Sequence, residues 1–435
     1  MAGEAPGEFY GHIPGEVPRE LPGQFPGQIS FQSGLRTSQD HPAPGPGTCR
    51  PPLSLYVHIP WCVRKCPYCD FNSHSPRGAI PEAAYVAALL RDLDLELASR
   101  GPAVQPLVSI FIGGGTPSLF SGAAMSRLLT GIRQRLPLTA AAEISLEANP
   151  GTADSANFAQ YQEAGINRLS LGVQSLNDDT LQALGRIHGP GEARQAVRLA
   201  RQAGFDNLNL DLMYGLPQQD LGQARDDLRE ALDLAPEHLS YYQLTLEPHT
   251  PFHATPPPLP DEDLTAEMQL QGQELLVSQG FTSYEVAAHA RPGRQCQHNL
   301  NYWTFGDYLG IGAGAHGKLT DPITGRIQRR AKPRQPSAYL TAVATAGPQG
   351  PPPGTAWSLR EDEVVLEFVM NSLRLTAGFP LQLFALRTGR APGALAAPLT
   401  AAQRAGLLTV KDDWVRPTEL GGRFLNDLVA LFMAT

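Results

Sequence analysis

Long apolar runs, charge and cysteine are all scarce in this chain of 435 residues. No apolar run reaches the roughly 18 residues that cross a bilayer, so the sequence predicts no transmembrane segment. The N-terminus has no basic start followed by an apolar core, which argues against a secretion signal. Charged residues make up 17% of the chain, with a formal net charge of -8. This acidic balance argues against a nucleic-acid-binding surface and leaves a peripheral membrane contact open.

Residues 1–50 have almost nothing to bury. They are rich in proline, glycine and glutamine and contain a loose eight-residue repeat, PGEFYGHI, PGEVPREL and PGQFPGQI. Such a composition predicts a disordered leader.

Three of the five cysteines, Cys62, Cys66 and Cys69, fall in one short stretch, YVHIPWCVRKCPYCDF at residues 56–71. The other two, Cys49 and Cys296, are distant in sequence, so a disulfide would leave a third thiol of the stretch unpaired. Uncrosslinked thiols predict a reducing compartment, with the cytoplasm as the default.

Three thiols form an incomplete shell for a metal that takes four ligands. Zinc would suit if His58 or His74 supplied the fourth ligand. A 4Fe-4S cluster would also suit, with one iron left open to an exogenous ligand. Arg64 and Lys65 within the loop would favour the thiolate forms.

From Leu53 onward, short apolar runs alternate with longer amphipathic stretches, which predicts β/α units and an α/β fold. Six strands, largely apolar as buried parallel strands are, imply a sheet that curls into a full or partial barrel. The expected helices cover residues 82–99, 123–136, 153–164 with Thr152 as N-cap, 180–203 with a break near 189–190, 221–234 and 263–279.

Polar residues follow these strands at their carboxyl ends, where barrels carry their sites. The cysteine stretch follows the first strand and GGGTPS, at residues 113–118, follows the second. Glu147 ends the third strand, Gln174 the fourth, and Asp211 lies near the end of the fifth. The three glycines would let a ligand approach the backbone closely, although they would equally suit a tight turn.

A second motif, HNLNYW, occupies residues 298–303. A histidine is more often structural than a ligand, but an imidazole beside an aromatic pair suits a flat tetrapyrrole with an axial position. His298 is therefore the candidate heme ligand, with Cys296 as a weaker alternative.

The three-then-two cysteine spacing with Tyr68 before the last cysteine resembles the cluster loop of the radical S-adenosylmethionine superfamily. The longer string LYVHIPWCVRKCPYCDFNSH resembles the branch that contains oxygen-independent coproporphyrinogen III oxidase and the HemW heme chaperones. The resemblance runs from about Leu53 to the C-terminus and implies a partial (β/α)6 barrel.

The resemblance also implies three ligands. The cluster would be held by Cys62, Cys66 and Cys69. S-adenosylmethionine would contact Tyr56, Tyr68, Gly114, Gly115, Thr116, Glu147, Gln174, Arg186 and Asp211. The HNxxYW pattern of the HemW branch is associated with heme and corresponds here to His298, Asn299, Tyr302 and Trp303.

The chain is thus expected to divide into five parts. They are the leader at 1–50, the radical S-adenosylmethionine barrel at 51–290, a segment closing the barrel at 291–346, a Pro/Gly-rich linker at 347–357, and a small winged-helix-like α+β domain at 358–435. The last part contains an expected hairpin, LLTVKDDWVRP, and a final helix from Thr418. It lacks the basic surface of a DNA reader, so a lid or docking role is expected.

Position 71 separates the two branches. The oxidase carries a fourth cysteine there, whereas this chain has Phe71. Together with HNxxYW, this favours a heme chaperone that binds the cluster, S-adenosylmethionine and heme and passes heme to an acceptor protein, for which a respiratory hemoprotein is a natural recipient. The replacement of the fourth cysteine by Phe71 argues against oxidase activity, and whether the chain is an enzyme is left open. The alternatives are the oxidase, which decarboxylates coproporphyrinogen III, and a zinc-stabilised binding module.

Overall fold

A computed structural model of the chain describes residues 50–100, 105–347 and 350–433. The predicted disordered leader therefore lies outside the described residues, apart from Arg50. The described residues belong to one compact unit.

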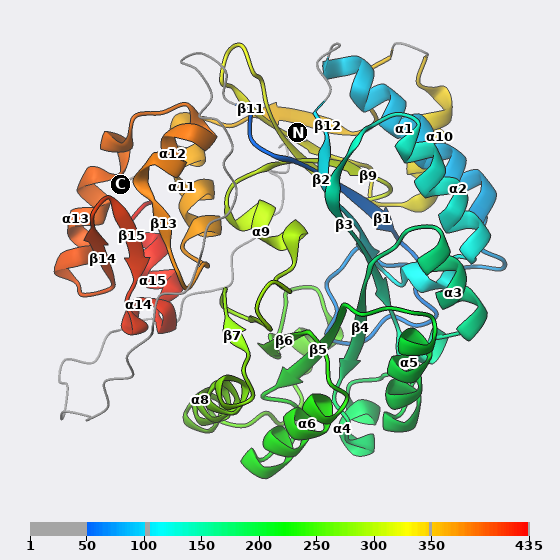
Figure 1. Ribbon diagram of the computed structural model, residues 1–435, viewed down its shortest axis with the longest axis horizontal. Helices are drawn as coiled ribbons and strands as arrows, with labels where there is room; N and C mark the ends of the chain where they lie inside the picture. The colour runs from blue at the N-terminus through cyan, green and yellow to red at the C-terminus, as the bar shows by residue number, and fades with distance from the viewer. Residues whose placement is uncertain (1–49, 101–104, 348–349, 434–435) are drawn as a thin grey trace. The chain divides into compact units, whose positions relative to one another are not determined.

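Six parallel strands form the centre of a twelve-stranded sheet and follow one another in chain order (Figure 1). They are β1 (Leu53–Ile59), β2 (Leu107–Gly114), β3 (Leu138–Ala148), β4 (Arg168–Gln174), β5 (Leu208–Tyr214) and β6 (His238–Gln243). The edges of the sheet are β7 and β12, so the six-stranded barrel is partial. The predicted α/β fold with a parallel sheet is confirmed.

Helices connect these strands. They are α1 (Glu82–Arg100), α2 (Gly122–Arg133), α3 (Ser155–Glu163), α4 (Asp178–Ala183), α5 (Pro190–Gln202), α6 (Leu221–Asp233), α7 (Pro251–Ala254) and α8 (Glu262–Ser278). The expected N-cap of α3 was wrong. Asp154 caps it by accepting from the amide of Ala156, whereas the Thr152 hydroxyl donates to the carbonyl of Asn149 and ends a 3-10 turn.

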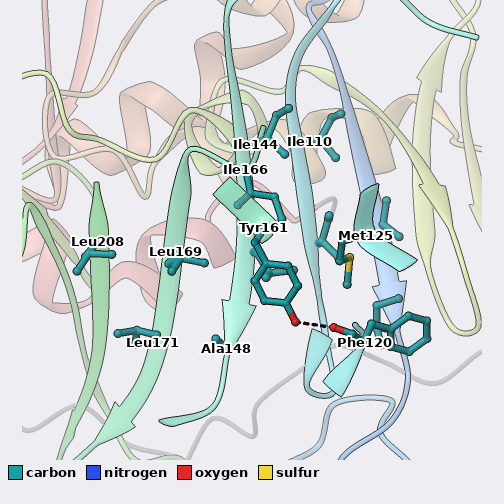
Figure 2. Close-up of a cluster of buried hydrophobic side chains, with 14 of the residues drawn as sticks. Ile110, Phe120, Met125, Ile144, Ala148, Tyr161, Ile166, Leu169, Leu171 and Leu208 are labelled. Carbon is teal, nitrogen blue, oxygen red and sulfur yellow. Dashed lines mark hydrogen bonds between the residues drawn. The ribbon is translucent and has the colours of Figure 1, made fainter. Parts of the chain in front are cut away.

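The parallel strands are largely apolar, as expected, and their polar residues fall at alternate positions. Leu55 and Val57 of β1 and their counterparts on the next strands pack under the helices. Figure 2 shows this layer around Tyr161, whose hydroxyl donates to the carbonyl of Phe120. The opposite face carries polar side chains that are bonded across strands, as Ser109 is to Ser54. The interior of the barrel is therefore a polar surface, because residues along a strand alternate between its faces.

The segment after β6 extends the sheet at both edges. Strands β7 (Thr282–Ser283) and β8 (Ala288–Ala290) continue from β6, and β9 (Asp307–Ile311) pairs in parallel with β1. Antiparallel strands β10 (His316–Thr320), β11 (Ile327–Ala331) and β12 (Thr355–Ser358) follow. The segment also contains α9 (Gln297–Trp303) and α10 (Pro336–Thr345).

The C-terminal residues form the predicted α+β module with its own apolar core. It comprises α11 (Glu361–Ser372), α12 (Leu381–Thr388), α13 (Ala396–Arg404) and a sheet of β13 (Phe379–Pro380), β14 (Leu408–Lys411) and β15 (Trp414–Pro417). The expected hairpin is β14 and β15. The expected final helix is two helices, α14 (Glu419–Arg423) and α15 (Leu425–Ala430), because Phe424 between them leaves helical geometry. Among the helices described, none has the length and apolar character needed to span a membrane.

Candidate functional site

The cysteine loop lies between β1 and α1, and its three thiols are free and half-buried. Backbone bonds close its base: the amide of Cys62 donates to the carbonyl of His74 (3.1 Å), and the amide of His74 donates to that of Pro60 (2.7 Å). A third bond, from the amide of Cys69 to the carbonyl of Cys66 (3.2 Å), tightens the turn. The loop therefore presents three soft donors from one short segment.

Two side chains from outside the cysteine loop donate hydrogen bonds to these thiols. Thr116 Oγ1 lies 3.4 Å from Cys62 Sγ, and Arg186 Nη1 lies 3.6 Å from Cys66 Sγ. Burial raises the pKa of Cys62 and raises the pKa of Cys69 to about 11, although the backbone of Phe71 and the charge of Lys65 lower the latter. The expected thiolate-favouring effect of the basic loop residues is thus outweighed by burial in the metal-free protein.

His58 is engaged on both ring nitrogens. Its Nε2 lies 2.8 Å from the carbonyl oxygen of Asn72, which can only accept, so Nε2 carries the proton and Nδ1 accepts from the Tyr56 hydroxyl at 3.0 Å. Burial lowers the pKa of His58 to about 4. His74 Nε2 faces Asn72 Oδ1 and the carbonyl of Arg334. These bonds give the zinc alternative no support from His58. Within the described residues, no three His, Cys, Asp or Glu side chains are grouped to hold a metal ion.

The glycine loop packs directly against the cysteine loop. A Cβ on Gly114 would lie 2.6 Å from the His58 ring, and one on Gly115 would lie 2.5 Å from the carbonyl oxygen of Trp61. The amides of both glycines are used within the protein: Gly114 donates to Glu147 Oε2 at 2.9 Å and Gly115 to the carbonyl of Ile59. Glycine is therefore required here for close packing of the two loops.

Two carboxylates face the barrel interior. Burial and, secondarily, the nearby Asp211 raise the pKa of Glu147 to about 8. Asp211 lies midway along β5 and not near its end, and it accepts from Asn209 Nδ2 (2.8 Å) and Ser170 Oγ (3.3 Å). Burial raises the pKa of Asp211 as well. A cation placed beside this pair would be stabilised by both carboxylates.

Gln174 and Arg186 lie on the same side of the barrel. Gln174 ends β4 with a φ of 70°, and its Oε1 accepts from the Tyr242 hydroxyl at 2.7 Å. Arg186 Nη2 donates to the carbonyl of Gly172 at 2.6 Å, while its Nε is buried with no partner among the described residues. Tyr68 packs against Phe252 of α7. An unsatisfied buried donor is what an absent anionic ligand would leave behind.

The HNLNYW residues form α9, which packs against β1 and β2. The His298 ring stacks on Phe111 with centroids 5.0 Å apart and meets the Tyr302 ring edge-on at 4.7 Å. Its Nδ1 lies 3.0 Å from Ser109 Oγ, whereas Nε2 is buried without a partner among the described residues. Burial lowers the pKa of His298 to about 3, so the imidazole is neutral. The side chain is 2% exposed.

Trp303 and Asn299 are the remaining residues of the motif that the sequence singled out. Trp303 carries the Arg374 guanidinium 4.4 Å from its ring centroid, toward the C-terminal module, and Asn299 is half-buried. Cys296, the weaker heme-ligand candidate, donates to Glu143 Oε1, and burial raises the pKa of its thiol to about 12. The helix thus brings His298 and Tyr302 together, at a spacing of four residues, and the Trp303 ring lies beside that of Tyr302 with centroids 6.5 Å apart.

Sequence reasoning missed several residues of this region. Ser109 and Phe111 contact His298, Tyr242 bonds Gln174, and Asn72 bonds His58. For Tyr242 a signal existed, because polar side chains at every second position of HLSYYQ mark an interior face, whereas LVSIFIG has only Ser109.

Comparison with known proteins identifies the family. Residues 56–232 match the sequence model of the Radical SAM superfamily, and residues 359–424 match that of the HemN C-terminal domain. The heme chaperone HemW of Escherichia coli (strain K12) is 51% identical over 385 residues, which are 88% of this chain and 99% of that protein. The chain belongs to the HemW family.

A second HemW, from Haemophilus influenzae, is 48% identical over 88% of this chain and 98% of its own length. Among solved structures, the coproporphyrinogen III oxidase HemN from Escherichia coli matches with a TM-score of 0.74 at 24% identity, covering 89% of this chain and 92% of that one. That likeness shows a shared fold. Membership of the radical SAM superfamily and the HemW family confirms the resemblance drawn from the sequence and implies a 4Fe-4S cluster and S-adenosylmethionine.

Proposed function

We propose that this HemW-family protein is a heme chaperone that holds a 4Fe-4S cluster and S-adenosylmethionine, takes up heme and passes it to an acceptor protein. The observation that carries the proposal is 51% identity to a HemW across 99% of that protein's length. The presence of HNLNYW and of Phe71 supports the chaperone over the oxidase.

The cysteine loop fits a cluster. Cys62, Cys66 and Cys69 are free soft donors on one segment, and Thr116 and Arg186 donate to two of their sulfurs. Such bonds stabilise sulfur ligands that carry negative charge. A bound cluster would supply one-electron chemistry, and its fourth corner would be open to S-adenosylmethionine.

The S-adenosylmethionine contacts are proposed from the family resemblance and the grouping of these residues around the loop. Glu147 and Asp211 would lower the energy of a nearby sulfonium, and Arg186 has an unpartnered Nε for a carboxylate. The full proposed set is Tyr56, Tyr68, Gly114, Gly115, Thr116, Glu147, Gln174, Arg186 and Asp211.

Heme is proposed to bind through His298, supported by Asn299, Tyr302 and Trp303. His298 Nδ1 bonds to Ser109, which leaves Nε2 as the free nitrogen. An uncharged imidazole nitrogen offers the lone pair that heme iron binds. The ring is enclosed by Phe111 and Tyr302, so a tetrapyrrole reaches it only after α9 or these rings move.

Anaerobic purification followed by iron, sulfide and heme analysis tests the proposal. The protein is expected to hold iron with sulfide and to shift the Soret band of added heme. His298→Ala should abolish that shift, and His289→Ala, a matched control at another buried histidine, should retain it. An unchanged spectrum in His298→Ala would disprove the ligand, zinc without iron would disprove the cluster, and failure to retain heme would disprove the chaperone.

The coproporphyrinogen III oxidase remains the second candidate because the fold is shared with HemN. Against it, Phe71 occupies the position of the fourth cysteine and its side chain is 60% exposed. Incubation with coproporphyrinogen III under anaerobic, reducing conditions separates the two: turnover to protoporphyrinogen IX would identify an oxidase.

The acceptor is proposed to be a hemoprotein of the respiratory chain. The chaperone would reach it from the cytoplasm, through a peripheral contact with the membrane. Pull-down of heme-loaded protein against purified apo-hemoproteins, followed by heme transfer spectra, tests this. Transfer that proceeds equally well from free heme would count against a delivery role.

A further inference from the structure

Asn72, three residues after Cys69, ties the cysteine loop to a distant part of the chain. Its side-chain Nδ2 donates to the carbonyls of Ala313 and Arg334, both at 2.9 Å. Its own carbonyl accepts from His58 Nε2, and its Oδ1 faces His74 Nε2 at 3.2 Å. One side chain therefore joins the loop to residues more than 240 positions away.

The receiving segment is rigid. The amide of Ala313 donates to the hydroxyl of Tyr85, which itself donates to the carbonyl of His58. Gly314 has a φ of 80°, and a Cβ at that position would overlap Asn72 Nδ2. The amide of Gly314 donates to the carbonyl of Pro333, which precedes Arg334. The segment that carries the two carbonyls is thus held by contacts that do not involve Asn72.

Apolar packing of the cysteine loop comes from Trp61 before it and from Tyr68 within it, which packs against Phe252. Between its first and last cysteine, Val63, Arg64 and Lys65 are exposed, and so are Asp70 and Phe71 beyond it. Between Cys69 and Ser73 no apolar side chain is buried, so polar contacts hold the segment that follows the last cysteine. Loss of both donors from Asn72 would leave the carbonyl of Ala313 without this donor and that of Arg334 with His74 Nε2 alone, so the loop end would be held less firmly.

We infer that Asn72 is a positioning residue for the cluster: it fixes the Cys69 end of the loop, so that the three thiols keep the spacing the cluster requires. This inference rests on the proposed function, since it concerns the same cysteines. Groups that support metal ligands in this way typically change metal affinity by about tenfold or more when removed.

The test compares wild type, Asn72→Ala and Asn72→Asp after anaerobic reconstitution with iron and sulfide. The aspartate keeps the size of the side chain but removes both donors. We expect both variants to lose iron to a chelator about tenfold faster than wild type, and the electron paramagnetic resonance signal of the reduced cluster to respond less to added S-adenosylmethionine.

Asn167→Ala is the matched control. Asn167 makes a similar clamp, accepting from the amide of Ile144 (2.8 Å) and donating to the carbonyl of Ala142 (3.0 Å), but it lies at the start of β4, away from the cysteines. It should lower thermal stability without changing the cluster signal. If Asn72→Ala is unfolded by circular dichroism, Asn72→Ser replaces it in the comparison.

The outcomes distinguish failure of the proposed function from failure of the positioning role of Asn72. Wild type that binds no iron and sulfide would overturn the proposed function. Wild type with a cluster, and Asn72 variants with the same iron loss and the same signal, would overturn the positioning role alone. Equal cluster loss in Asn167→Ala would show a general stability effect and would likewise overturn it.

Discussion

Lys332 is expected to be among the most sensitive positions for stability. Its ammonium lies 2.6 Å from a carboxylate oxygen of both Asp92 and Glu96, and the side chain is 1% exposed. Tyr339 also donates to Asp92 at 2.9 Å. In Lys332→Met, two buried carboxylates would lose their shared cation.

Breaking a buried pair by removing one partner costs about 3–5 kcal/mol, because the remaining charge is uncompensated. The upper end applies here, since two carboxylates depend on one ammonium and only Asp92 keeps the hydroxyl of Tyr339. Arg330 Nε, 3.1 Å from Glu96 Oε1, offsets part of the loss. We therefore expect the free energy of unfolding of the metal-free protein to fall by about 4 kcal/mol at pH 8.

The loss of stability in Lys332→Met is expected to depend on pH. Burial raises the pKa of Asp92 to about 6 even though Lys332 opposes it, and removal of Lys332 raises it further. The folded variant then binds more protons than the unfolded chain above about pH 4, so its stability falls as pH rises. The deficit relative to wild type should be large at pH 8 and shrink toward pH 5.

Urea unfolding followed by circular dichroism at pH 5 and pH 8 measures both quantities. Arg423→Met is the control, because its ion pair with Glu419 is exposed and should contribute about 0.5 kcal/mol or less. A Lys332→Met deficit below about 1 kcal/mol, or one that does not change with pH, would refute the view that this cluster is a buried charged network.

Three further substitutions test the barrel. Glu147→Gln should flatten the pH dependence of the metal-free protein: the raised pKa of about 8 makes wild type lose about 1–3 kcal/mol as pH rises from 4.5 to 8, measurable by urea unfolding at both ends. Tyr161→Phe should cost about 1–2 kcal/mol in the same assay, because the buried carbonyl of Phe120 loses its donor. Gly310→Ala should cost at least about 2 kcal/mol, because its Cβ would overlap the carbonyl of His316, whereas Gly393→Ala, in open space, should stay within about 0.5 kcal/mol by thermal unfolding.

The fold was predictable because its signals are local. Six apolar runs separated by amphipathic stretches predict β1 to β6, although not the six further strands of the sheet. The rule that barrels carry sites at strand ends placed Gly114 and Glu147 together, and the Gly114 amide donates to Glu147. The alternation of polar and apolar residues along β3 and β5 was equally local, but the expectation that parallel strands are largely apolar obscured it.

The contacts that complete the site were not predictable, because they join residues far apart in sequence. Asn72 meets Ala313 across 241 positions, and Ser109 meets His298 across 189. The direction of Trp303 depends on Arg374 of the C-terminal module. Periodicity fixes which residues share a face of one element, but not which partner that face meets.

Tyr56 stands between the two proposed ligands. Its hydroxyl donates to His58, whose ring covers Gly114, and its own ring lies against that of His298 with centroids 6.3 Å apart. A turn of Tyr56 that uncovers His298 also breaks its bond to His58. If heme and S-adenosylmethionine bind at the proposed sites, any factor by which one changes the affinity for the other applies in both directions.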